Sequence, residues 1–101
     1  MKKSLILAAS LVLAASAVHA VELKGAKLQK SATVTLAQAE ATALKARPGK
    51  VTDKELEKEP GGSGLRYSFD ITGVDGKPYE VGVDARTGKI LENAAEGKNP
   101  D

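Results

Sequence analysis

The sequence predicts an α+β fold, in which one N-terminal helix packs on a three- to four-stranded antiparallel sheet as a two-layer sandwich. Three observations predict it. Residues 35–47 have helical periodicity, residues 65–72 alternate between apolar and polar side chains, and residues 81–91 (VGVDARTGKIL) place two apolar runs around a polar turn. The helix and the strands each have one apolar face, so the two layers can cover each other, and the short connections favour antiparallel pairing.

The first twenty residues have the features of a cleaved secretory signal. A basic start, MKK, precedes the apolar, small-residue-rich stretch SLILAASLVLAASAVHA. Its apolar core, residues 5–17, is shorter than the roughly 20 residues that span a bilayer. We predict cleavage between Ala20 and Val21, with a cut after Ala17 or a retained N-terminal anchor as the alternatives. The mature protein is then expected to be periplasmic or secreted, without a membrane span.

Loss of the signal changes the composition that bears on function. Lys2 and Lys3 leave with it, so thirteen basic residues balance thirteen acidic ones, and no basic stripe remains for nucleic acid. The mature chain also contains no His, Cys or Trp. Nucleophiles activated by histidine and zinc sites built from imidazole or thiolate are therefore excluded. We predict that the protein is not an enzyme and has no catalytic residue, no cofactor and no metal site.

Residues 35–47 are predicted to form the helix. Thr35 is a suitable N-cap, and Gln38 completes a capping-box pattern. Apolar side chains recur on one face at helical spacing: Leu36, Ala39, Ala43 and Leu44. The two alanines are small, so this face is expected to lie close against a sheet. Pro48 and Gly49 end the helix, because proline cannot continue the hydrogen-bond ladder.

Three segments have weaker patterns. Residues 21–31 have no sustained period and are predicted to be a flexible lead, with a short strand as the weaker alternative. Residues 53–59 are predicted to be an edge strand with Leu56 pointing inward, because flanking charges discourage edge-to-edge pairing. Continuation as a helix is the alternative, since Glu and Lys favour helices. Residues 60–64 (PGGSG) are predicted to be a connector, because they lack the Gly-Lys-Ser/Thr ending of a phosphate-binding loop.

The remaining strands are predicted from alternation and turn residues. Apolar side chains in residues 65–72 and 79–84 point to one face: Leu65, Tyr67, Phe69, Ile71, Tyr79, Val81 and Val83. Asp75 and Gly76 predict a tight turn between these strands, and Asp84 with Gly88 predicts the next one. Ile90 and Leu91 form the last short strand, and residues 94–101 are a polar tail.

The opposite face of the sheet, or an open edge strand, is the predicted functional surface. Its candidate residues are expected to be exposed: Arg66, Ser68, Asp70 and Glu80, with Gly82 among them. An extended peptide could add to an open edge through backbone hydrogen bonds. Two acidic clusters could be reactive sites, but each has a structural interpretation. We interpret Asp70, Asp75 and Asp84 as turn-stabilising rather than cation-binding, and Glu55, Glu57 and Glu59 as a solvated strand without raised pKa values.

Three stretches carry a resemblance to a known family: TLAQAEATALKARPGKV, YSFDI and YEVGVDARTGKIL. Together with the charged strand between the first two, they resemble the PepSY domain over residues 32–93. The resemblance implies a helix packed on an antiparallel sheet in an exported module that binds or inhibits proteases, as in propeptides of thermolysin-like metalloproteases. It carries over no catalytic residues. No protease domain accompanies the module in this sequence, so it is expected to act in trans.

Two functions are therefore expected. The first is a periplasmic PepSY-like binding module whose partner is an envelope protein, with a protease as the candidate that it inhibits or regulates. The alternative is an envelope sensor accessory that binds a small ligand or divalent cation through its exposed carboxylates.

Overall fold

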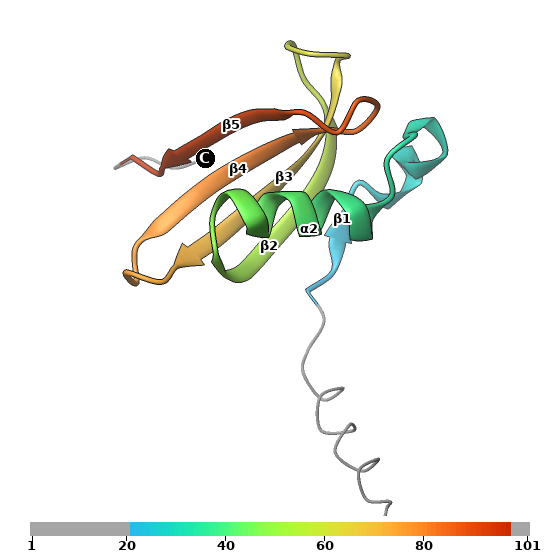
Figure 1. Cartoon of the computed structure of the whole chain (residues 1–101). Coiled ribbons are helices and arrows are strands. Elements are labelled where there is room, and N and C mark those ends of the chain that lie inside the picture. The colour runs from blue at the N-terminus through green and yellow to red at the C-terminus, as the bar shows by residue number, and fades with distance from the viewer. Residues whose placement is uncertain (1–20, 98–101) are drawn as a thin grey trace, which may run out of the picture.

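The computed structural model describes residues 21–97, and the predicted signal segment, residues 1–20, lies outside them. One helix lies across one face of a five-stranded sheet (Figure 1). The elements follow the chain as β1 (Leu23–Lys24), η2 (Ala26–Ser31, a 3₁₀ helix), α2 (Leu36–Ala46), β2 (Gly49–Lys58), β3 (Leu65–Gly73), β4 (Pro78–Asp84) and β5 (Ile90–Ala95). The strand order across the sheet is β1-β2-β3-β4-β5.

The predicted three- to four-stranded antiparallel sheet is wrong, because the sheet has five strands and is mixed. β1 pairs in parallel with β2, with Leu23 opposite Lys54 and Lys24 opposite Glu55, whereas all the other pairs are antiparallel. β1 comes from the segment predicted to be a lead. A strand of two residues is too short for its sequence to show apolar–polar alternation. Gly25 ends β1 with a φ of +80°, and a Cβ there would lie 2.1 Å from the Leu56 carbonyl oxygen.

The charged strand is consequently not an edge strand, contrary to prediction. β2 lies between β1 and β3, and it begins at Gly49 rather than Asp53. A bulge between Val51 and Asp53 interrupts its pairing with β3. Leu56 is buried, as predicted, at 1% exposure. The other edge of the sheet is β5, which continues to Ala95, beyond the predicted end at Leu91.

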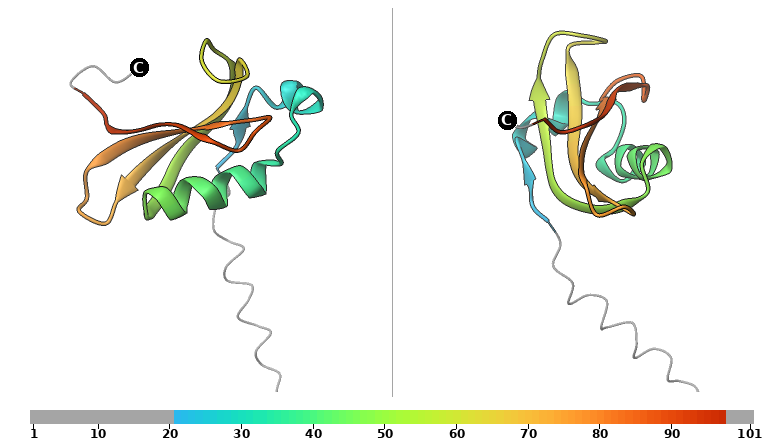
Figure 2. Two further views of the ribbon diagram at one scale, coloured as in Figure 1. Left: turned by 45° about the horizontal axis from the view of Figure 1, so that its top comes forward. Right: turned by 90° about the vertical axis from the view of Figure 1, so that its left-hand side faces the viewer.

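The helix forms as the capping pattern predicts. The Gln38 backbone N–H donates to Thr35 Oγ1, and the Thr35 backbone N–H donates to Gln38 Oε1, at 3.1 and 2.9 Å. Ala39 and Ala43 are fully buried against the sheet, and Leu36 and Leu44 pack at the margin of the same core. Two further views show α2 lying along one face of the sheet (Figure 2). Alanine on this face lets the helix backbone approach the strands closely.

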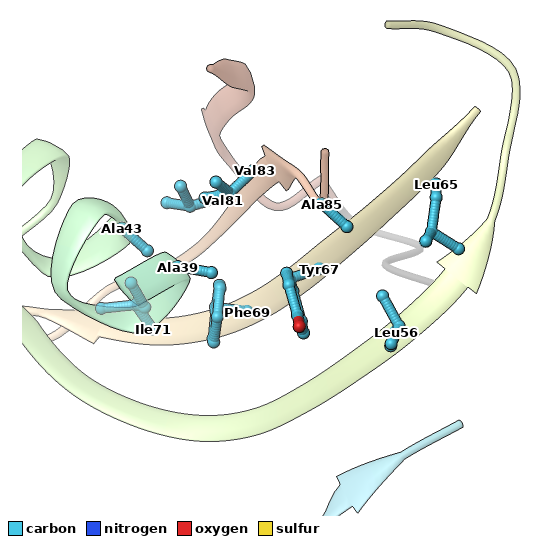
Figure 3. Packing of buried hydrophobic residues seen from close by; sticks show 10 residues of the cluster. All are labelled: Ala39, Ala43, Leu56, Leu65, Tyr67, Phe69, Ile71, Val81, Val83 and Ala85. Carbon is cyan, nitrogen blue, oxygen red and sulfur yellow. The ribbon is translucent and has the colours of Figure 1, made fainter. Parts of the chain in front are cut away.

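The core lies between α2 and the sheet, with β3 at its centre. Tyr67, Phe69 and Ile71 project from β3 toward side chains of the helix and of β4, as Figure 3 shows. The Tyr67 and Phe69 rings stack with centroids 6.3 Å apart. The Tyr67 hydroxyl donates to the Val34 carbonyl at 2.7 Å, which satisfies the polar end of a side chain that is 1% exposed. These aromatic residues are therefore core residues, as alternation predicts.

The final hairpin closes on the residues that precede the helix. Asp84 Oδ1 accepts from the backbone N–H groups of Arg86 and Thr87, and Gly88 has a φ of +82°, as predicted for this turn. The Ala85 carbonyl accepts from the N–H groups of both Thr33 and Val34, each at 2.9 Å. The turn thus connects the beginning and the end of the domain.

Candidate functional site

The sheet face opposite α2 carries a hollow of about 520 Å³, which we call the acidic trough. Its lining contains eight carboxylates, one lysine and one serine: Asp53, Glu55, Glu57, Glu59, Asp70, Glu80, Glu92, Glu96, Lys24 and Ser68. Alternation along each strand places these side chains on one face, while their neighbours enter the core on the other. The lining side chains come from strands on both sides of β3, so negative charge is concentrated on this face.

The structure brings the four predicted surface residues together on this face, but only two of them are partly exposed. Arg66 and Ser68 are 7% and 9% exposed, whereas Asp70 and Glu80 are half-buried. Ser68 is covered because its Oγ donates to Glu57 Oε2 at 2.8 Å. The expectation of exposure is therefore wrong for Arg66, Ser68 and Gly82, since side chains from neighbouring strands cover them.

Arg66 is buried because Gly82, its neighbour on β4, leaves room for it. A Cβ at Gly82 would lie 3.2 Å from Arg66 Nη1. The guanidinium lies 3.5 Å from Glu92 Oε1 and 4.0 Å from Glu59 Oε2, and Nη2 donates to the Pro60 carbonyl at 3.2 Å. Its Nε has no hydrogen-bond partner in the described part of the chain. This single buried cation offsets part of the negative charge at one end of the trough.

Toward the other end of the trough, three carboxylates lie close together beside the Lys24–Asp53 ion pair. One carboxylate oxygen from each of Asp70, Glu80 and Glu96 lies within 4.8 Å of the other two. Burial, followed by the negative charges of Glu92 and Asp70, raises the pKa of Glu80 to about 7. Carboxylates are ligands for hard cations, so these three residues are the group that could hold one. Asp70 is thus a member of a carboxylate cluster and not a turn residue, which corrects the prediction.

A second carboxylate is perturbed on β2. Burial raises the pKa of Glu57 above its ordinary value, and the neighbouring Glu59 and Glu55 act in the same direction, outweighing the hydrogen bond from Ser68. The sequence-based expectation that this row keeps ordinary pKa values is therefore wrong for Glu57. The expectation rested on the lack of an apolar pocket in the sequence, but burial within the sheet face, followed by the nearby carboxylates, raises the pKa of Glu57 without one.

The two turn aspartates have the predicted role. Asp75 Oδ1 accepts from the Lys77 N–H, and Asp75 Oδ2 accepts from the Tyr79 hydroxyl; these contacts lower the pKa of Asp75, the Tyr79 contact most. Burial alone would raise the pKa of Asp84. Hydrogen bonds from Arg86 and Ser63 outweigh burial and hold this pKa well below its ordinary value. Ser63 donates through both its N–H and its Oγ, each at 2.7 Å.

At one end of α2 a cationic side chain meets the sheet on the helix side. The Arg47 guanidinium carbon lies 3.8 Å from the centroid of the Tyr79 ring. Arg47 Nε donates to Asn93 Oδ1 on β5 at 3.0 Å, and Asn93 Nδ2 donates to the Ala46 carbonyl at 3.4 Å. These contacts tie the C-terminal end of the helix to the last strand.

Comparison with known proteins agrees with the predicted resemblance. Residues 33–93 match the family model of PepSY, the peptidase propeptide and YPEB domain. The chain belongs to the PepSY family. Neither the curated proteins nor the solved structures contain a match to it. The matched residues include α2 and the first four positions of β5. Two contributors to the trough lie outside the match: β1, which precedes it in the sequence, and Glu96, which follows it.

PepSY domains are generally propeptide or inhibitor modules. The trough combines eight carboxylates with one lysine and one serine. Such a surface favours cationic groups through charge complementarity. Within residues 21–97, the chain forms no helix with the length and apolar character needed to cross a membrane.

Proposed function

We propose that this protein is an exported PepSY module that binds a peptidase of the cell envelope in trans and inhibits or regulates it. The observation that carries the proposal is the family match over residues 33–93, because it spans the helix and nearly all of β2–β5. The face of the sheet under α2 is occupied by the domain's own core. The acidic trough is the opposite face, and it offers a partner a concave surface with many charged contacts.

Titration against peptidase activity tests this function. The purified protein is added to envelope extract, and separately to a thermolysin-like metallopeptidase, while hydrolysis of a fluorogenic peptide is followed. We expect a saturable loss of activity in at least one of the two, with the protein itself intact by mass spectrometry at the end of the assay. An unrelated small protein at the same concentration controls for competition between substrates. Unchanged hydrolysis in a large molar excess of the protein would contradict the proposal.

Export is a separate part of the proposal with its own measurement. A signal that ends at Ala20 yields a mature protein that begins at Val21, and intact mass spectrometry of the protein from the periplasm or medium measures this directly. A protein that begins at Val18 would indicate the alternative cut after Ala17. A full-length mass in the membrane fraction would indicate a retained anchor instead, and a full-length mass in the cytoplasm would refute export.

The carboxylate cluster favours cation binding as the second candidate function. A divalent cation on Asp70, Glu80 and Glu96 would raise the melting temperature by mass action. Thermal unfolding with Ca²⁺, Mg²⁺ or Mn²⁺ measures this shift. We expect Glu80→Gln to abolish it and Glu59→Gln, at the Arg66 end of the trough, to preserve it. Equal responses in both variants would indicate diffuse screening of charge rather than a site.

A further inference from the structure

The last strand presents an edge that the rest of the described chain does not cover. β5 is the final strand in the sheet order, and its only strand partner within residues 21–97 is β4. Asn93, Ala94 and Ala95 are exposed. β5 contains neither lysine nor proline, the residues that usually protect a sheet edge, although it is short and begins with a bulge. An open strand edge is a template for another strand.

The hydrogen-bond register identifies the backbone groups that are available there. The Glu96 N–H donates to the Pro78 carbonyl at 3.1 Å, so the Glu96 backbone faces β4. Direction alternates along an antiparallel strand. The backbone groups of Ala94 therefore also face β4, opposite Glu80, whereas those of Asn93 and Ala95 point away from the sheet. Two residues thus offer both an N–H and a carbonyl to an added strand.

The side chains beside this edge indicate what kind of strand would be added. Glu92 on β5 and Glu96, the residue after it, line the acidic trough next to Glu80 on β4. Every second side chain of an added strand would point to the same face as these carboxylates. Cationic side chains at those positions would meet opposite charge, and acidic ones would be repelled.

We propose that the free edge of β5 binds an extended peptide segment with Lys or Arg at every second position, which adds to the sheet as a sixth strand. This inference rests on the proposed function, because it specifies the part of a polypeptide partner that the module would recognise. Backbone hydrogen bonds to Asn93 and Ala95 hold the segment. The trough carboxylates attract the face of the added segment that carries its Lys or Arg side chains.

Two labelled peptides of identical composition test the proposal. In one, lysine alternates with threonine; in the other, the lysines are contiguous. Fluorescence anisotropy with the purified protein should show the alternating peptide binding at least about tenfold more tightly, since contiguous lysines place only half their charges on the acidic face. Raising the salt from about 0.1 M to about 1 M should weaken both complexes, because screening shortens the range of the charges. Equal affinities for the two peptides would overturn the proposal.

A proline variant separates strand addition from charge attraction. Ala95→Pro removes an N–H that points away from β4, a position where proline is tolerated on edge strands. It should weaken the binding of the alternating peptide by roughly tenfold, because a backbone hydrogen bond is lost. The affinity for the contiguous peptide and the thermal unfolding transition of the protein should be unchanged. Hydrogen exchange on the unmodified protein gives an independent measure, since the amides of Asn93 and Ala95 should gain protection with the alternating peptide. Unchanged affinity in the variant, or unchanged protection, contradicts strand addition.

The remaining outcomes are also distinguishable. If the protein alone sediments as a dimer that Ala95→Pro dissociates, a second copy occupies the edge, and the peptide proposal is wrong. If neither peptide binds selectively while peptidase inhibition persists, the peptidase function holds and the β5 inference fails. If the alternating peptide binds selectively but no peptidase is inhibited, the β5 inference holds and the proposed function fails.

Discussion

Replacing Glu80 by glutamine should stabilise the protein in a pH-dependent way. Glu80 lies among other carboxylates on the outer face of β4, and burial with neighbouring negative charge raises its pKa from 4.5 to about 7. The unfolded chain therefore loses this proton near pH 4.5, and the folded chain loses it near pH 7. Between those values the folded state binds more protons, so the free energy of unfolding falls as the pH rises. Glu80→Gln removes this loss because glutamine resembles the protonated acid and stays neutral.

The magnitude follows from the size of the shift. One pKa unit corresponds to about 1.4 kcal/mol, so a rise from 4.5 to about 7 would correspond to roughly 3 kcal/mol for a group shielded from solvent. Glu80 is only half-buried, and screening by water reduces the effect to about 1–2 kcal/mol. For a domain of this size that difference corresponds to a rise in Tm of roughly 5–10 °C.

Urea unfolding of both proteins from pH 4.5 to pH 8 measures the effect. The two free energies of unfolding should nearly coincide at pH 4.5 and diverge by about 1–2 kcal/mol in favour of Glu80→Gln above pH 7. Glu22→Gln is the matched control, since it removes the same charge from an exposed side chain outside the trough. Parallel curves for Glu80→Gln and the unmodified protein, or an equal divergence for Glu22→Gln, would refute the reasoning.

Three further substitutions test the fold by chemical denaturation. Asp84→Ala should lower the free energy of unfolding by about 3 kcal/mol at pH 7. The depressed pKa of Asp84 stabilises the fold above the ordinary carboxyl pKa of 3.8, and this stabilisation is lost as the pH falls. The variant should therefore lose less stability in acid than the unmodified protein does. If the variant and the unmodified protein lose the same free energy of unfolding at low pH, Asp84 does not have that role. Tyr67→Phe should cost about 1 kcal/mol by removing the bond to Val34, and no loss would mean that water replaces it. Ala43→Leu should cost about 1–3 kcal/mol by overpacking a fully buried contact, whereas a neutral result would show that the helix can move away from the sheet.

Local pattern predicts the elements of this domain that are long enough to show a period. Strict alternation in residues 65–72 places Tyr67 and Phe69 in the core, and the capping box locates the start of α2. A strand in residues 21–31 was only the weaker alternative, because β1 has two residues and its parallel pairing with β2 follows only from tertiary structure. Without β1, β2 would lie at the edge of the sheet, which is why the sequence predicts it there. In the structure the charged side chains of β2 line the trough instead of protecting an edge.

The candidate site was predicted in part. Period-two alternation assigns Arg66, Ser68, Asp70 and Glu80 to one face, and they share it in the structure. Their burial depends on partners in other strands, such as Glu57 over Ser68, and on the space that Gly82 leaves for Arg66. The strand register decides which acidic residues are neighbours, and that register cannot be read from one strand at a time. The acidic residues at every second position of β2, Asp53, Glu55 and Glu57, were the available signal.

The two hydrogen bonds from Thr33 and Val34 to the Ala85 carbonyl bear on the order of folding. They connect segments about fifty positions apart, and contacts of such separation form slowly because a long loop must close first. A chain that emerges from its N-terminus can therefore form these two bonds only after β4 and the following turn are available. The entry to the helix is thus fixed late, whatever the helix has already packed against.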